Sequence, residues 1–90
     1  MSVSVKLSSL LRKFTNWQEV VEVSGDNPIA CLHNVEAQFP GIRDWLYDKQ
    51  GEFLPQVQFY VNGERVYADE LTNPLKDGDE VFILLAIGGG

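Results

Sequence analysis

The stretch SGDNPIACLHNVEAQFPG, residues 24–41, decides the fold because it predicts one helix with both ends marked. Asp26 or Asn27 can cap its start, and Pro28 suits the first turn, where a missing N–H costs no hydrogen bond. Pro40-Gly41 ends the helix. Four apolar residues recur at helical spacing, and we expect them to face a sheet: Ile29, Leu32, Val35 and Phe39.

Two strands are predicted before this helix. VSVKL (residues 3–7) alternates apolar and polar side chains, and WQEVVEV (residues 17–23) does so through Val21 and Val23. A loop containing RKFTN (residues 12–16) joins them. Because the two strands are neighbours in the chain, we expect an antiparallel hairpin.

Three further strands are predicted after the helix, beyond IRDWLYD (residues 42–48), which can add one helical turn. QVQFYV (residues 56–61) alternates and runs into Asn62-Gly63, the dipeptide that a type I′ turn prefers, before a short strand at residues 65–67. The turn-rich segment ELTNPLKDGDE then leads to EVFILLAI (residues 80–87). A helix across one face of such a mixed sheet defines an α+β roll.

Composition indicates a single intracellular domain. The chain has 90 residues, of which 44% are hydrophobic, enough for a small core. It contains no apolar run near the roughly 18 residues of a membrane span and no signal-peptide pattern at its start. The single cysteine, Cys31, cannot form an internal disulfide, which favours the cytoplasm.

The charge balance limits the classes of molecule that the chain is expected to bind. Thirteen acidic and seven basic side chains give a formal charge of −6, the wrong sign for binding nucleic acid or an anionic membrane. An acidic domain is suited to meet basic protein surfaces, with charge speeding the encounter. Alternatively, the charge only keeps the protein soluble.

The last strand has two apolar sides. Alternation places Val81, Ile83 and Leu85 together, and we assign them to the core by analogy with the other strands. Phe82 and Leu84 then lie on the open face of the sheet, where a contiguous apolar patch marks a partner-docking site. Alternatively, the end of QVQFYV or the Leu10-Leu11 segment covers them.

The chain ends on Gly88, Gly89 and Gly90, which we interpret as a flexible tail (residues 88–90) after a domain of residues 1–87. Glycine suits a narrow channel and leaves the terminal carboxylate unhindered. A carboxylate is a poor electrophile, but adenylation by ATP gives it a good leaving group, and a nucleophile such as sulfide or an amine can then attack. The domain would supply a handle and a substrate end, without a catalytic group.

The other candidate residues indicate no second site. His33, the only histidine, is interpreted as a helix-surface residue and Cys31 as a packing residue, so neither a metal site nor a catalytic triad is expected. The segment DGDE (residues 77–80) lacks the spacing of a calcium loop and is interpreted as a solvated turn. Trp17 and Trp45 are expected in the core or at its edge. We therefore do not expect an enzyme.

With these features the chain resembles the ubiquitin-like, β-grasp sulfur-carrier family. That family includes the small subunit of molybdopterin synthase and the thiamine- and cysteine-biosynthesis sulfur carriers. The resemblance rests on the element order, the turn PLKDGDEV (residues 74–81), the hairpin FYVNGERV (residues 59–66) and the final Gly89-Gly90. Residues 3–15 and 21–48 are most similar to the cysteine-biosynthesis type. Gly88 departs from the side chain that the family commonly has there.

The resemblance implies a mechanism. An enzyme of the ubiquitin-activating type would use ATP and magnesium to adenylate the carboxylate of Gly90, with Gly88 and Gly89 threaded into that enzyme. Sulfur from a persulfide or sulfide would displace AMP and leave a thiocarboxylate. A cysteine-synthase-like or molybdopterin-synthase-like enzyme would hold the acceptor, Phe82 and Leu84 would contact partners, and the chain itself would bind no cofactor. Two alternatives are a protein modifier joined through Gly90 to lysines and a non-covalent interaction module.

Overall fold

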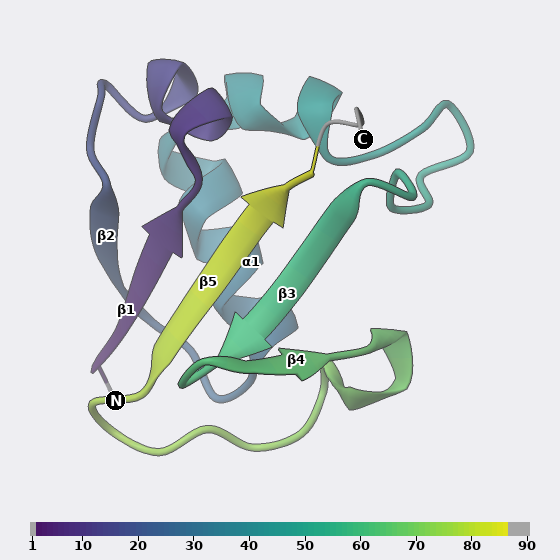
Figure 1. Ribbon diagram of the computed structural model, residues 1–90. Coiled ribbons are helices and arrows are strands. Elements are labelled where there is room, and N and C mark those ends of the chain that lie inside the picture. Colours follow the sequence, from purple (N-terminus) through teal and green to yellow (C-terminus); the bar gives the residue numbers. More distant parts are fainter. Residues whose placement is uncertain (1, 87–90) are drawn as a thin grey trace.

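A five-stranded mixed sheet carries one α-helix across one of its faces (Figure 1). The computed structural model describes residues 2–86. The sheet has the order β2-β1-β5-β3-β4. Its strands are β1 (Ser2–Leu7), β2 (Val20–Ser24), β3 (Val57–Val61), β4 (Glu64–Val66) and β5 (Glu80–Leu85). The predicted α+β roll is confirmed.

Strand β5 lies at the centre of the sheet and is paired on both sides. It runs parallel to β1 and antiparallel to β3. The predicted hairpin of β1 and β2 is antiparallel, as is the pair β3 and β4, which turns at Asn62 and Gly63 with positive φ values of 50° and 86°. The last strand of the domain is therefore held between the first and the third.

Helix α1 (Pro28–Gln38) has the predicted ends. The Asn27 side chain, and not that of Asp26, caps it by accepting the N–H of Ala30 at 2.8 Å. The predicted sheet-facing row is confirmed: Leu32 and Val35 are buried, and Ile29 and Phe39 are partly buried against the core.

Within the described residues there are also three 3₁₀ helices: η1 (Ser9–Phe14), η2 (Pro40–Trp45) and η3 (Ala68–Glu70). Helix η2 is the extra turn predicted after α1. Helix η1 replaces the first part of the predicted loop at residues 12–16, because burying Leu11 folds that segment onto the core.

The second strand starts at Val20, so the prediction of a strand from residue 17 was wrong at its beginning. Asn16 and Trp17 have positive φ values of 55° and 64°, which a strand does not accommodate. Thr15 is fully buried, and its hydroxyl contacts the carbonyls of Arg12 and Gln18. This contact holds the turn before β2.

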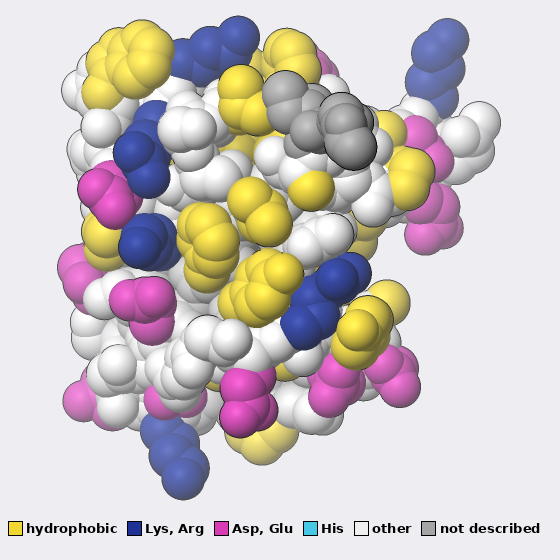
Figure 2. Space-filling view, viewed as in Figure 1, with side chains coloured by type: hydrophobic (Ala, Val, Ile, Leu, Met, Phe, Trp, Pro, Cys, Tyr) yellow, Lys and Arg dark blue, Asp and Glu magenta, His cyan; other side chains and the backbone are white. Residues whose placement is uncertain are grey.

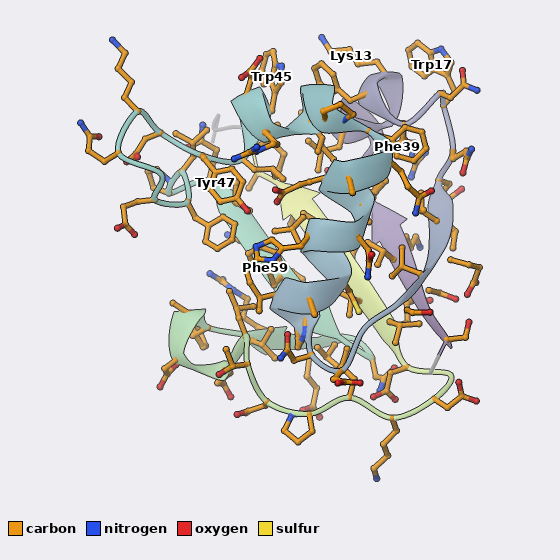
Figure 3. The ribbon with its side chains drawn as sticks, turned by 180° about the vertical axis from the view of Figure 1, so that it is seen from behind. Lys13, Trp17, Phe39, Trp45, Tyr47 and Phe59 are labelled. Carbon is orange, nitrogen blue, oxygen red and sulfur yellow. The ribbon has the colours of Figure 1, made fainter. Side chains whose placement is uncertain are left out.

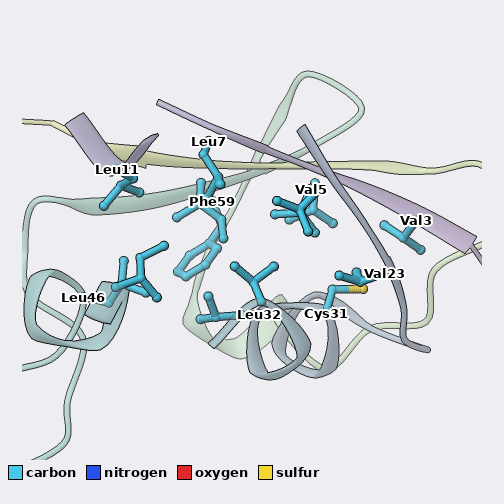
Figure 4. Close-up of a cluster of buried hydrophobic side chains, with 14 of the residues drawn as sticks. Val3, Val5, Leu7, Leu11, Val23, Cys31, Leu32, Leu46 and Phe59 are labelled. Atoms are coloured by element: carbon cyan, nitrogen blue, oxygen red, sulfur yellow. The ribbon is translucent and has the colours of Figure 1, made fainter. Parts of the chain in front are cut away.

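The core lies between the sheet and α1 (Figure 4). Its side chains come from β1, β2, β3 and β5 on one side and from α1, η1, η2 and nearby loop residues on the other. Among residues 2–86 no helix is long and apolar enough to cross a membrane. The predicted boundary between Ile87 and Gly88 lies outside the described residues.

Candidate functional site

Strand β5 has the two-sided arrangement that its alternation predicts. Val81, Ile83 and Leu85 are buried, with exposed fractions of 1%, 0% and 3%. Phe82 and Leu84 point to the opposite face and are half-buried. Their side chains are therefore accessible on the face that α1 does not cover.

A cross-strand aromatic pair forms the centre of this open face. The rings of Phe82 and Tyr60 are 6.0 Å apart, and the two residues are direct partners on β5 and β3. The Lys6 ammonium lies 5.7 Å from the centre of the Phe82 ring. Figure 2 shows this hydrophobic patch with basic side chains on both sides. The sequence interpretation missed Tyr60, although its position in QVQFYV predicts the same face as Gln58.

The alternative in which neighbouring segments cover the patch holds only in part. Tyr60 packs beside Phe82 without burying it. Of the Leu10-Leu11 pair, Leu11 is buried in the core and Leu10 is 41% exposed. Phe82 and Leu84 thus remain half-buried.

The end of β5 is fastened on both sides. The N–H of Leu85 donates to the Ser8 hydroxyl at 3.0 Å, and this bond is buried. The N–H of Ala86 donates to the Gln56 carbonyl at 2.8 Å. The backbone is thereby fixed up to the residue that precedes the segment 87–90. Sequence reasoning missed Ser8, since nothing local distinguishes it from Ser9.

The structure places the two residues that were considered as metal ligands or catalytic groups, His33 and Cys31, where the sequence predicts them. His33 is exposed on α1 as predicted. Cys31 is buried as predicted, and burial together with the nearby Asp26 carboxylate raises the pKa of its thiol. Among residues 2–86 there is no cluster of three side chains of the kinds that hold a metal ion.

The turn before β5 uses its carboxylates internally. Asp79 accepts the Lys76 N–H at 2.8 Å and the Asn62 amide at 3.0 Å, and the bond from Lys76 is the main cause that lowers the pKa of Asp79. Asp77 accepts the Ser2 N–H at 2.8 Å. These bonds agree with the predicted turn and tie it to β1 and to the β3–β4 hairpin.

The expectation for the tryptophans was wrong for Trp17, which is 73% exposed because its left-handed turn aims it outward. Trp45 is 43% exposed, and its ring lies 5.7 Å from that of Phe14 at the edge of the core. The Lys13 ammonium lies 5.0 Å from the Trp45 ring. Figure 3 shows these two tryptophans and Lys13 at one end of the molecule.

A polar contact connects α1 to η2 on the side away from the open face. The Tyr47 hydroxyl donates to Glu36 at 2.5 Å, and Arg43 lies 3.6 Å from the same carboxylate. Glu36 is only 9% exposed. Burial and this hydrogen bond raise the pKa of Tyr47 well above its usual value. Each polar group here has a partner, so the contact is structural.

The fold and the patch beside the end of β5 define a ubiquitin-like, β-grasp carrier module. The chain belongs to the ThiS family, whose model matches residues 5–90.

Two curated relatives fit this class. The sulfur carrier protein CysO of Mycobacterium tuberculosis is 38% identical over 93 residues, covering 100% of both chains. Its crystal structure superposes with a TM-score of 0.80 at 36% identity, covering 94% of this chain and 99% of that one. Small archaeal modifier protein 3 of Haloferax volcanii is 33% identical, covering 89% of this chain and 96% of the relative.

A third likeness includes a partner protein. The crystal structure of the Amycolatopsis orientalis BexX/CysO complex matches with a TM-score of 0.82 and 31% identity, covering 98% of this chain and 99% of that one. These relatives are small carriers or modifiers, and the chain is grouped with carrier proteins and not with enzymes. The likeness supports a sulfur-carrier role that involves partner proteins. Gly88, Gly89 and Gly90 lie outside the described residues.

Proposed function

We propose that the chain is a sulfur carrier whose Gly90 carboxylate is adenylated by a ubiquitin-activating-type enzyme and converted to a thiocarboxylate. The observation that carries this proposal is the full-length similarity to a sulfur carrier, together with a family match that extends through Gly90. A further support is the half-buried apolar pair Phe82 and Leu84 on β5, the last strand before Gly88.

The proposed chemistry has two balanced steps. A carboxylate oxygen of Gly90 attacks the α-phosphorus of ATP, a P–O bond breaks, and magnesium pyrophosphate leaves. Hydrosulfide then attacks the carbonyl carbon of the acyl adenylate, the C–O bond to AMP breaks, and the thiocarboxylate remains. ATP and magnesium belong to the activating enzyme, and this chain binds no cofactor of its own.

The residues of this chain position the reacting end. Phe82 and Leu84 dock the domain on its partner, and the bonds from Leu85 to Ser8 and from Ala86 to Gln56 fix the direction of the strand that leads to the tail. Gly88 and Gly89 pass through a channel in the enzyme that side chains would obstruct. A rigid handle limits the entropy lost when the tail is bound.

The acceptor that best fits the proposal is a cysteine-synthase-like enzyme in the cytoplasm, because the chain is 38% identical over its full length to the sulfur carrier CysO and 31% identical to the CysO of the BexX complex. Sulfur would pass from the thiocarboxylate to an activated serine there. A molybdopterin-synthase-like enzyme is the other candidate acceptor, and Gly88 lies where it could change the choice between them.

A second candidate function is a protein modifier joined through Gly90 to target lysines, supported by the likeness to small archaeal modifier protein 3. Both functions begin with the same adenylate and differ in the nucleophile. A non-covalent interaction module is the third candidate, and it predicts that the glycines are dispensable.

Intact-mass spectrometry on protein isolated from its source cells tests the proposal, before and after treatment with an alkylating agent that labels thiocarboxylates. We expect a species with one oxygen replaced by sulfur, localised to Gly90. Branched peptides that carry Gly90 on a lysine would support the modifier instead. If neither product forms, even when ATP, sulfide and cell extract are supplied, both the carrier and the modifier function are refuted.

A matched pair of glycine changes controls the test. Deleting Gly89 and Gly90 should abolish the sulfur-bearing species. Gly41→Ala changes a glycine of η2 whose added Cβ would meet only Phe14 Cδ1, at 3.6 Å, and should leave it intact.

A further inference from the structure

We propose that a charge-selective docking row crosses the open face and binds an apolar partner surface rimmed with carboxylates. The row consists of Lys6, Phe82, Tyr60 and Arg65. The inference rests on the proposed function, because the partner it describes is the activating enzyme that receives the C-terminus. It adds the sign of the charge that this enzyme must present.

The strand register assembles the row from four strands. Lys6 on β1 is paired with Phe82 on β5, Phe82 with Tyr60 on β3, and Tyr60 with Arg65 on β4. Directly paired residues lie on the same face of a sheet. With strands about 4.8 Å apart, the row spans about 14 Å. Two aromatic rings therefore lie between two cations.

Both cations keep charge available for a partner. Lys6 lies 3.8 Å from Glu19, but Arg12 lies 3.7 Å from the same carboxylate oxygen, so one anion serves two cations. Arg65 is exposed, and no carboxylate among residues 2–86 lies within 4.0 Å of its guanidinium. Instead, its guanidinium lies 4.7 Å from the ring of Tyr67.

Besides Glu19, which is shared by Lys6 and Arg12, two acidic side chains of the open face lie in the neighbouring row. Glu22 and Glu80 are both paired with Ser4, two residues before Lys6 and closer to the start of β5. Glu22 also accepts the Ser4 hydroxyl at 2.5 Å. Figure 2 shows acidic side chains below the hydrophobic patch and basic ones beside it. The face is thus negative near the start of β5, and basic and apolar towards its end.

The end of β5 selects the basic half of the open face. Gly90 follows β5 in the sequence, so we expect an enzyme that takes the terminal carboxylate to approach the end of β5, beside the docking row. Charges interact over about 8 Å at physiological ionic strength, so carboxylates on the far side of the domain contribute little at contact. The local row, and not the formal charge of −6, therefore sets the complementary sign.

Charge reversal tests the sign. The initial rate of Gly90 thiocarboxylate formation is measured by intact mass in source-cell extract with ATP and sulfide, at carrier concentrations below saturation. We expect Lys6→Glu and Arg65→Glu each to slow the reaction about fivefold at low salt, because rim charges act mainly on association rates. The difference from wild type should shrink as salt is added.

Two matched variants carry the same change of charge elsewhere. Lys49→Glu, in the loop before β3, and Lys76→Glu, in the turn before β5, are exposed and lie outside the sheet, and their rates should stay within about twofold of wild type. Lys6→Gln and Arg65→Gln should give intermediate rates, and circular dichroism verifies that every variant is folded.

The outcomes separate the two proposals. Slowing confined to the docking row supports the inference. Equal rates in all variants, or faster rates in Lys6→Glu and Arg65→Glu, would overturn it while leaving the sulfur-carrier function standing. No thiocarboxylate on wild-type protein would overturn the proposed function and this inference with it.

Discussion

The two faces of the sheet are built from alternate residues of the same strands, yet they differ in what covers them. Beneath α1, Val5 and Ile83 are fully buried. On the open face their chain neighbours Lys6 and Phe82 are only half-buried, and no element of residues 2–86 crosses above them. Packing accounts for the first set, whereas folding alone does not require an aromatic pair between cations. Stability and partner binding should therefore respond to different residues of one strand.

Neighbouring substitutions on β5 should show the largest contrast. Ile83→Ala removes a fully buried side chain, and we expect the free energy of unfolding to fall by about 2–5 kcal/mol. Phe82→Ala should cost about 1 kcal/mol or less, since that ring is already partly in water. Urea unfolding followed by tryptophan fluorescence gives both values.

In the thiocarboxylate assay we expect the opposite order, with the larger effect at Phe82 and the smaller one at Ile83. Phe82→Ala and Leu84→Ala should slow the reaction about tenfold or more, as a loss of roughly 1.4 kcal/mol in docking would. Folded Ile83→Ala should react like wild type. If Ile83→Ala and Phe82→Ala lost stability and rate in equal proportion, the separation of the two faces would not hold.

A glycine between the sheet and α1 sharpens the contrast on the covered side. A Cβ on Gly25 would lie 2.7 Å from Cys31 Sγ and 2.9 Å from the Cys31 backbone nitrogen. Gly25→Ala must therefore push the helix from β2, and we expect a loss of about 1–3 kcal/mol in unfolding free energy. Gly41→Ala is the control, expected within about 0.5 kcal/mol of wild type. Equal values would mean that the helix shifts without cost.

The covered face was largely predictable because its signals are local. Period-two alternation identified Val81, Ile83 and Leu85, and helical spacing identified Leu32 and Val35, all of which are buried. Burial of one side chain constrains the orientation of the next by the geometry of a strand or helix. The open-face orientation of Phe82 followed from the same rule.

The composition of the open face depends on the register between strands that are distant in the sequence, and periodicity does not specify that register. Tyr60 joins Phe82 only because β3 pairs with β5 in one particular register, and Lys6 joins it through the parallel pairing of β1. The Trp17 turn was missed because positive φ is rare for a residue with a bulky side chain. The role of Gly90 was inferred from family resemblance, and detection of its thiocarboxylate by mass spectrometry tests that role.

A smaller effect on stability is expected from the hydrogen bond between the end of β5 and Ser8. Ser8→Ala would leave the buried N–H of Leu85 without its partner, and an unsatisfied buried donor costs about 1–3 kcal/mol. Amide exchange at Leu85, measured by NMR, should accelerate more than exchange at Val81. Ser9→Ala, at an exposed neighbour, is the control. Unchanged protection at Leu85 would show that β1 and β3 hold the strand end without this hydroxyl.

The smallest effect concerns how the covering layer is held at alkaline pH. In the folded state, burial and the bond to Glu36 keep the Tyr47 phenol neutral and raise its pKa. In the unfolded chain a tyrosine titrates near about pH 10. The stabilisation is therefore complete below about pH 10 and is lost as pH rises towards the folded-state pKa. Tyr47→Phe should remove this alkaline loss while costing about 1 kcal/mol at pH 7, because Glu36 loses a donor.

Urea midpoints between about pH 8 and pH 11 check this prediction, with exposed Tyr67→Phe as the control that should keep the wild-type slope. Arg43 remains 3.6 Å from Glu36 in the variant, so the carboxylate is not left alone and the loss at neutral pH stays modest. If Tyr47→Phe retained the wild-type alkaline slope, a group other than Tyr47 would cause the alkaline loss, and the covered face would depend on its apolar packing and on the contact of Arg43 with Glu36. The two faces would then differ mainly in whether the chain itself or a partner covers the apolar side chains.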